Sequence, residues 1–216
     1  MSQATTEWNV MNSADVLELS PVVPVVVLDD AAHAVPLANA LLRGGIRTIE
    51  VTLRTDAGLS AIEQISAEVP DVVVGAGTIT EPGQAEQAAK AGARYLVTPG
   101  CTDRLLAEVD DTGLPCLPGV STVSEAMRLA ERGLRALKFF PAEPSGGVPY
   151  LKALAGPLPD LRFCPTGGIS PDNAPKYLVL PNVRCVGGSW LAPKGLLAAG
   201  AWGEIETLAR QAADLR

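Results

Sequence analysis

The stretch Thr48-Ile-Glu-Val-Thr-Leu-Arg54 alternates polar and apolar side chains along the chain. Successive side chains of a β-strand point to opposite faces, so Glu50, Thr52 and Arg54 share one face and the apolar residues between them share the other. The apolar face suits burial against helices. An unpaired charge on the inner face is costly, so the polar face predicts either a structural ion pair or a ligand site inside a barrel.

Seven further short apolar segments occur before and after this strand in the sequence. Helical patterns with apolar residues at three- and four-residue spacing lie between them. The eight predicted strands are Val22–Leu28, Thr48–Leu53, Val72–Gly75, Tyr95–Thr98, Pro115–Leu117, Leu134–Phe139, Leu161–Cys164 and Val183–Val186. Predicted helices include Ala31–Arg43, Pro82–Ala91, Ser124–Arg132 and Gly203–Leu215.

Eight alternating units predict the α/β class and one (β/α)8 TIM barrel spanning residues 1–216 as a single domain. Residues 1–13 are expected to be disordered or to form a short capping segment. A doubly wound open sheet is the structural alternative that periodicity leaves open, and the count of eight favours the barrel.

The composition excludes several classes of protein. Of the 216 residues, 47% are hydrophobic and 19% are charged, which is typical of a globular protein. The formal net charge of -7 argues against nucleic acid and anionic membrane as partners, because both attract basic surfaces. Neither a secretory signal nor a membrane-spanning apolar run is present, so we expect a cytoplasmic protein.

Cysteine and histidine usage limits the possible chemistry. The four cysteines show no C-x-x-C spacing, and we expect small buried side chains rather than a disulfide framework. His33 is the only histidine, so a multi-histidine zinc site within the chain is excluded. The sequence also shows no P-loop or G-x-G-x-x-G fingerprint, so a nucleotide is not implied, and we expect neither a metal nor another cofactor.

Lys138 ends the predicted strand in the stretch Leu134-Arg-Ala-Leu-Lys-Phe-Phe-Pro-Ala-Glu143, on a face of apolar neighbours. Desolvation disfavours a charged ammonium group. An ordinary lysine has a pKa of about 10.4, so only roughly one in a few thousand is neutral at pH 7, whereas attack on a carbonyl needs the free amine. The position is therefore a candidate nucleophile, and a solvated surface lysine is the alternative.

Three glycine clusters are candidate anion-binding loops: Gly75-Ala-Gly-Thr78, Thr166-Gly-Gly168 and Gly187-Gly-Ser189. Each is predicted to follow an apolar strand, and glycine lets backbone N–H groups approach a ligand closely. Phosphate in a TIM barrel commonly lies in the loops after the last two strands, where the second and third clusters are expected.

Taken together, the chain resembles the 2-keto-3-deoxy-6-phosphogluconate (KDPG) and 4-hydroxy-2-oxoglutarate aldolase family from about Pro21 to its C-terminus. The motifs that carry the resemblance, in order, are Pro21-Val-Val-Pro-Val25, Glu50-Val-Thr-Leu-Arg-Thr55, Gly75-Ala-Gly-Thr78, Thr98-Pro-Gly100, Pro118-Gly-Val-Ser-Thr122, Lys138-Phe-Phe-Pro-Ala-Glu143, Phe163-Cys-Pro-Thr-Gly-Gly-Ile-Ser170 and Gly187-Gly-Ser-Trp190.

The resemblance implies a class I aldolase, a carbon–carbon lyase that cleaves KDPG reversibly to pyruvate and glyceraldehyde 3-phosphate. Lys138 would form the Schiff base, and Glu50 would act as general acid and base. The implied substrate-binding residues are Arg54 and Thr78 for the carboxylate of pyruvate, Pro99 and Phe140 as pocket walls, Thr166 for the aldehyde portion, and Gly167, Gly168, Gly187, Gly188 and Ser189 for the phosphate.

The family further implies a homotrimer in the Entner–Doudoroff pathway of carbohydrate metabolism. Where some relatives carry a basic residue after the first strand, this chain has Asp29-Asp30. Alternative substrates are 4-hydroxy-2-oxoglutarate and the galactonate epimer of KDPG. Alternatives from other classes are a phosphosugar isomerase or epimerase, and a non-catalytic sugar-phosphate binding protein.

Overall fold

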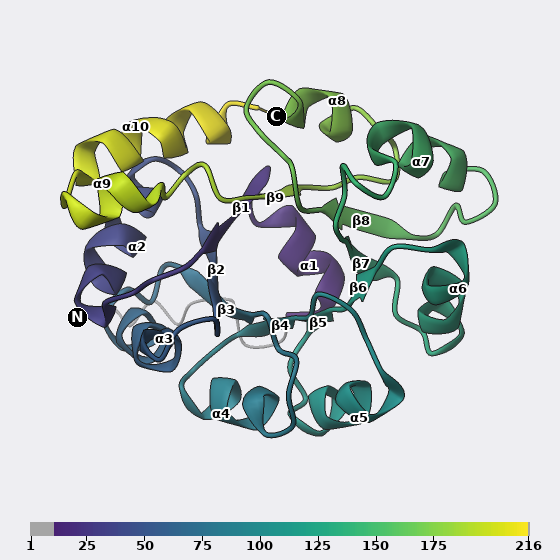
Figure 1. Cartoon of the computed structure of the whole chain (residues 1–216), viewed down its shortest axis with the longest axis horizontal. Coiled ribbons are helices and arrows are strands. Elements are labelled where there is room, and N and C mark those ends of the chain that lie inside the picture. The colour runs from purple at the N-terminus through teal and green to yellow at the C-terminus, as the bar shows by residue number, and fades with distance from the viewer. Residues whose placement is uncertain (1–10, 216) are drawn as a thin grey trace, which may run out of the picture.

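A computed structural model describes residues 11–215, which form a ring of parallel strands surrounded by helices (Figure 1). The strands are β1 (Val22–Val26), β2 (Thr48–Thr52), β3 (Val73–Gly77), β4 (Tyr95–Val97), β5 (Cys116–Leu117), β6 (Gly119–Val120), β7 (Ala136–Phe139), β8 (Arg162–Pro165) and β9 (Val186–Gly188). Six strands pair in the order β5-β4-β3-β2-β1-β9, and three pair in the order β6-β7-β8.

The two groups of strands form one eight-membered ring. Pro118 separates β5 from β6, so these two short strands correspond to the single predicted fifth strand. Proline lacks the N–H that a continuous ladder requires, which explains the interruption. On the other side, isolated parallel bridges join Phe163 to Val183 and Thr166 to Gly187, linking β8 to the chain of β9. The predicted barrel is confirmed.

The helices cover the outer surface of the ring (Figure 1). They are α2 (Ala34–Arg43), α3 (Ala57–Glu68), α4 (Gln84–Lys90), α5 (Asp103–Asp111), α6 (Val123–Glu131), α7 (Gly147–Leu154), α8 (Ala174–Leu178), α9 (Lys194–Ala198) and α10 (Trp202–Ala213), with the 3-10 turn η1 (Ala31–His33) before α2. Their apolar faces and the outward side chains of the strands, including Ile49 and Val51, form one buried cluster. None of the helices among residues 11–215 is long and apolar enough to cross a membrane.

A remaining helix, α1 (Ser13–Glu18), overlaps the centre of the ring in the view of Figure 1 and packs at one end of it, where Oγ of Ser13 accepts a hydrogen bond from the N–H of Cys116 at the start of β5. Asn12 begins it with a capping box, accepting hydrogen bonds from Ala14 and Asp15 while Asp15 accepts from the backbone of Asn12. Val16 and Leu17 are fully buried in a second cluster with inward side chains of the strands. The prediction that residues 1–13 are disordered or form a short capping segment falls mostly on residues 1–10, which lie outside the described part of the chain, while Asn12 is the N-cap of α1 and Ser13 is its first residue.

The predicted strand boundaries were wrong at two glycine clusters. The third strand continues to Gly77 instead of ending at Gly75, and the last regular strand begins at Val186 instead of ending there. Gly187 and Gly188 therefore lie inside β9 and do not follow it. The prediction failed because these glycines were interpreted as loop residues, whereas they make room for bulky side chains of neighbouring strands and loops.

Candidate active site

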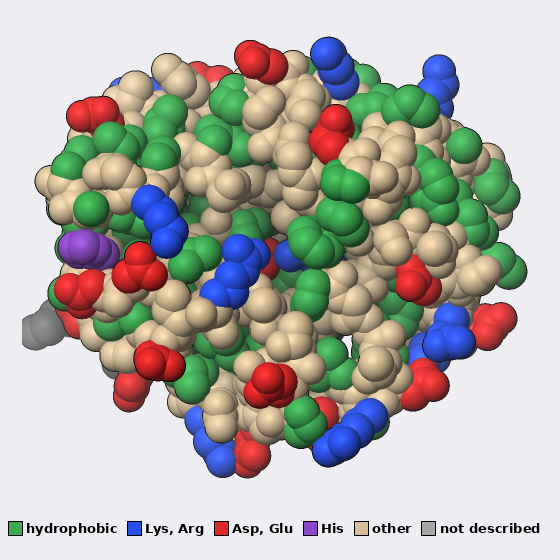
Figure 2. Space-filling view, in the orientation of Figure 1, with side chains coloured by type: hydrophobic (Ala, Val, Ile, Leu, Met, Phe, Trp, Pro, Cys, Tyr) green, Lys and Arg blue, Asp and Glu red, His purple; other side chains and the backbone are tan. Residues whose placement is uncertain are grey.

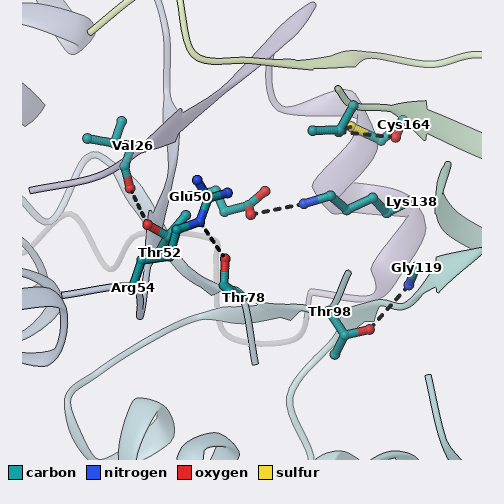
Figure 3. A network of polar contacts seen from close by, with 10 residues as sticks. Val26, Glu50, Thr52, Arg54, Thr78, Thr98, Gly119, Lys138 and Cys164 are labelled. Atoms are coloured by element: carbon teal, nitrogen blue, oxygen red, sulfur yellow. Dashed lines mark hydrogen bonds and ion pairs between the residues drawn. The ribbon is translucent and has the colours of Figure 1, made fainter. Parts of the chain in front are cut away.

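Glu50 and Lys138 meet inside the ring of strands, although 88 positions separate them in the sequence. The ammonium Nζ of Lys138 donates a hydrogen bond to Oε1 of Glu50 at 3.1 Å (Figure 3). Only 6% of the lysine side chain and 4% of the glutamate side chain are exposed. A buried ion pair of this kind is expensive to desolvate, so its presence calls for a role beyond stability.

Local sequence aims each of these side chains inward. Alternation along β2 points Glu50 into the ring, as predicted, while Ile49 and Val51 pack outward. In β7, Lys138 pairs in parallel register with Gly119 of β6. A side chain at Gly77 would place its first carbon 2.1 Å from Oε1 of Glu50, so only glycine leaves space for the carboxylate.

Arg54 and Thr78 lie beside this pair at the ends of β2 and β3. Nε of Arg54 donates to Oγ1 of Thr78 at 3.4 Å (Figure 3). Arg54 is exposed and Thr78 is half-buried. Thr78 has a φ of 62°, the only positive φ among non-glycine residues of the described chain. A β-branched residue is strained in this region, and such strain gathers at functional sites.

Pro99 follows β4 and Phe140 follows β7, the strands on either side of β5 and β6 in the ring. The ring of Phe140 lies 5.5 Å from Nζ of Lys138, a cation–π distance. Gly119 lets its strand approach Pro99, because a first side-chain carbon there would lie 2.3 Å from the carbonyl of Pro99. Pro99 and Phe140 are half-buried, as walls of an open pocket would be.

The loop after β8 carries Thr166, Gly167 and Gly168. Thr166 is buried, and its backbone bridges to Gly187. Gly167 and Gly168 have φ values of 102° and 80°, a region that side chains disfavour, so this predicted cluster is a true glycine loop.

The last predicted cluster has a different structure. A side-chain carbon at Gly187 would lie 2.2 Å from Oγ1 of Thr166, and one at Gly188 would lie 1.8 Å from the ring of Trp190. These two glycines admit neighbouring side chains, and only Ser189 lies beyond the strand, where it is exposed.

The first cluster also serves close packing. A side chain at Gly75 would overlap the ring of Tyr95, at 2.3 Å. Tyr95 is fully buried inside the ring, where its hydroxyl bonds to Oγ1 of Thr48 at 2.9 Å. Burial raises the pKa of Tyr95 well above its ordinary value, against the lowering effect of the Thr48 hydrogen bond, and the charge of Glu50 adds to the rise. Tyr95 therefore stays protonated beneath the ion pair.

Sequence reasoning missed three contacts in the loops that follow the strands. The buried hydroxyl of Tyr177 donates to the carboxylate of Glu143, for which the sequence offered no role. Asp29 accepts from Lys194 at 3.4 Å across the surface, and Asp30 caps η1 by accepting from the backbone of Ala32. The acidic pair after β1 thus has structural partners. Its cap could have been found from the Asp-Ala-Ala-His sequence, whereas the distant partner could not.

The face of the molecule in Figure 2 shows basic side chains near the centre of the ring, surrounded by acidic and neutral ones. The acidic protein can therefore offer a local positive site to an anion.

Within residues 11–215, no three His, Cys, Asp or Glu side chains gather as a metal site would require. The four cysteines form no disulfide.

Comparison with known proteins places this geometry in context. Residues 14–208 match the family model described as KDPG and KHG aldolase. The chain is 53% identical over 208 residues to a 2-dehydro-3-deoxy-phosphogluconate aldolase of Pseudoalteromonas atlantica, covering 96% of each chain.

Two solved structures superpose closely. One is KDPG aldolase from Legionella pneumophila with pyruvate captured at low pH as a covalent carbinolamine intermediate; its TM-score is 0.92 and its identity is 43%, over 94% of this chain and 98% of that one. The other is the 2-keto-3-deoxy-6-phosphogluconate aldolase of Zymomonas mobilis with 3-phosphoglycerate, at a TM-score of 0.87 and 44% identity, over 94% and 96% of the two chains.

Proposed function

The chain belongs to the KDPG and KHG aldolase family, and from this premise we propose how its own residues carry the reaction. The protein is a class I aldolase, a carbon–carbon lyase that cleaves KDPG reversibly to pyruvate and glyceraldehyde 3-phosphate. The observation that carries the assignment of residues is the buried contact between Lys138 and Glu50, 3.1 Å long, inside the ring of strands.

Lys138 is the nucleophile in this proposal. Glu50 accepts a proton from the ammonium group through the hydrogen bond between them, which leaves a free amine. The amine attacks C2 of the keto acid, and the resulting carbinolamine loses its hydroxyl group as water when Glu50 returns the proton. The product is a protonated imine at C2.

The imine then accepts the electrons of the breaking bond. Glu50, directly or through a water molecule, removes the proton of the C4 hydroxyl group, the C3–C4 bond breaks, and glyceraldehyde 3-phosphate leaves. The electron pair moves into the C2–C3 bond as an enamine. Protonation at C3 and hydrolysis of the imine release pyruvate and restore the lysine.

The rest of the site is proposed to hold the two ends of the substrate. Arg54 and Thr78 bind the carboxylate, and a guanidinium group suits that partner. Pro99 and Phe140 form the walls, and Thr166 contacts the aldehyde portion. The phosphate is bound by the loops of the last two strands, whose proposed residues are Gly167, Gly168, Gly187, Gly188 and Ser189.

The close packing at Gly187 and Gly188 refines this last assignment. Both glycines are buried in β9, and like every glycine they could serve the phosphate only through backbone N–H groups, whereas the exposed Ser189 and Gly168 can offer donors from the surface. The Zymomonas mobilis structure contains the phosphorylated three-carbon acid 3-phosphoglycerate, which supports a phosphate subsite in the family.

Substrate preference and biological setting are also proposals. We infer KDPG over 4-hydroxy-2-oxoglutarate, because the relative with 53% identity is a 2-dehydro-3-deoxy-phosphogluconate aldolase. Residues 1–216 are proposed to act as one domain in a cytoplasmic homotrimer of the Entner–Doudoroff pathway. Light scattering of the purified protein tests the trimer, and a mass of one or two chains would contradict it.

Borohydride reduction in the presence of pyruvate tests the mechanism. We expect a pyruvate adduct on the peptide that contains Lys138, and none on that peptide in Lys138→Ala. Glu50→Gln is the second variant, and general acid–base catalysis of roughly 10²- to 10⁴-fold should be lost from kcat. An adduct on another lysine, or cleavage at the normal rate in Lys138→Ala, would contradict the proposal.

A further inference from the structure

The loops that follow β7 and β8 are joined to each other by their backbones. The N–H of Ala142 donates to the carbonyl of Thr166 at 2.8 Å, and the N–H of Glu143 donates to the carbonyl of Gly167 at 3.1 Å. The first loop leads away from Lys138, and the second carries the proposed phosphate site. A shift of one loop therefore moves the phosphate site relative to the nucleophile.

The side chain of Glu143 adds a third connection, to a helix. Its Oε1 accepts a hydrogen bond from the hydroxyl of Tyr177, which is fully buried in α8. Burial raises the pKa of the Tyr177 hydroxyl above its ordinary value, and the hydrogen bond and charge of Glu143 raise it further. The Tyr177 hydroxyl therefore remains protonated and a hydrogen-bond donor at neutral pH.

Two glycines bring these side chains together. A side-chain carbon at Gly168 would lie 2.7 Å from Cγ of Glu143, and one at Gly147 would lie 2.9 Å from the hydroxyl of Tyr177. Both glycines have a positive φ, of 80° and 56°. The stem of Glu143 is thus in close contact with the backbone of the glycine loop while its carboxylate bonds to the helix beyond.

The charge of Glu143 makes this arrangement informative. A carboxylate beside a loop that binds phosphate would repel the ligand if it were free to face it. The hydrogen bond to Tyr177 holds the carboxylate against α8 instead. Neither side chain takes part in the proposed proton transfers, and the mechanism leaves both unexplained.

We propose that Glu143 and Tyr177 are positioning residues that set the place of the Gly167–Gly168 loop relative to Lys138, and thereby the affinity for the phosphorylated end of the substrate. This inference rests on the proposed function. Asn173 also holds this loop, because its Nδ2 donates to the carbonyl of Gly168 at 2.9 Å. Misplacement of a bound group by about 1 Å can cost roughly 10²-fold in rate, so even a partial shift of the loop is expected to be measurable.

The test separates the two ends of the substrate. In Tyr177→Phe, which keeps the ring but loses the donor, we expect KM for KDPG to rise about tenfold, within the range that misplacement allows. The rate of borohydride trapping with pyruvate, which carries no phosphate, should stay at the wild-type value. Glu143→Gln retains an acceptor for the hydroxyl and should stay within about twofold of wild type in KM. Glu143→Ala also loses the stem that lies against Gly168, so it should raise KM at least as much as Tyr177→Phe.

Tyr150→Phe is the matched control, because Tyr150 lies on α7 with its ring stacked on Phe139 at 5.4 Å. It should change neither readout. Equal losses for KDPG and pyruvate in Tyr177→Phe, or an unchanged KM in both Tyr177→Phe and Glu143→Ala, would overturn the inference. Absence of pyruvate trapping in the wild-type protein would instead overturn the proposed function, so the two failures are distinguishable.

Discussion

The two ends of the barrel interior are filled with opposite kinds of side chain. At the closed end, α1 inserts Val16 and Leu17 among apolar and small inward residues, and both side chains are fully buried. At the other end, which is the open end, the buried residues are Glu50 and Lys138, beside the strained backbone of Thr78. The same strands supply both ends, and alternation along each strand is the same.

The difference separates stability from chemistry within one ring. Apolar burial stabilises by roughly 25 cal/mol for each Å² removed from water, whereas a buried ion pair is neutral or unfavourable compared with apolar groups of similar size. The closed end therefore offsets the cost of the open end. Variants at each end should move stability and activity in different ways.

The largest expected effect is at the open end. Lys138→Met should lower kcat/KM by several orders of magnitude, since the proposed nucleophile is lost. It should also destabilise the protein by about 3–5 kcal/mol, since Glu50 is left buried without its partner. The double variant Lys138→Met/Glu50→Met should remain inactive but regain at least wild-type stability. Urea unfolding measures this, and a double variant less stable than the single one would break the comparison.

The closed end should respond in the reverse way. Leu17→Ala should cost about 2–5 kcal/mol of unfolding free energy, because it leaves a cavity in a fully buried cluster. The kcat of the folded enzyme should not change. Val179→Ala is the control, since 79% of Val179 is exposed and its truncation should be nearly neutral. A kcat that falls together with stability would show that the two ends are coupled.

A smaller effect is expected at Thr78, where the backbone has a φ of 62°. Thr78→Gly removes about 1–3 kcal/mol of strain but adds roughly 0.5–1 kcal/mol of flexibility in the unfolded chain. We expect an unchanged or slightly higher melting temperature together with a raised KM. Thr80→Gly, two residues later in the exposed loop, has no strain to relieve and should lower the melting temperature.

The smallest effect concerns an acidic residue that caps a helix. Glu125 forms a capping box with Thr122 at the start of α6. Burial raises the pKa of Glu125, but hydrogen bonds from Ser121 and Thr122 outweigh it and leave the pKa below its ordinary value. A lowered pKa in the folded state stabilises above about pH 4.3, and this contribution is lost as the pH falls through the folded value.

Glu125→Gln should therefore lower the unfolding free energy by less than about 1 kcal/mol at pH 7, because the group is exposed and screened by solvent. The difference from wild type should shrink below about pH 4.3 and vanish once the pH is below the folded pKa. Melting temperatures across this range measure it. An equal difference at pH 3 and pH 7 would mean that charge has no part in the cap.

The sequence by itself determined the eight units and the inward direction of Glu50, because period-two alternation and β-branched segments are properties of residues close together in the chain. It also indicated Lys138 as the candidate nucleophile, from its place at the end of an apolar strand. These predictions needed no knowledge of which strands become neighbours.

Only the tertiary structure decided which distant residues meet. The 3.1 Å contact of Lys138 with Glu50 depends on the closure and register of the ring. The same closure explains why Gly77 and Gly187 must be glycine, since each faces a side chain from another strand or loop. Those partners are not visible in the local sequence, so the two glycines were predicted to be loop residues. Local patterns fix the direction of a side chain, whereas the partner it meets is fixed by long-range packing.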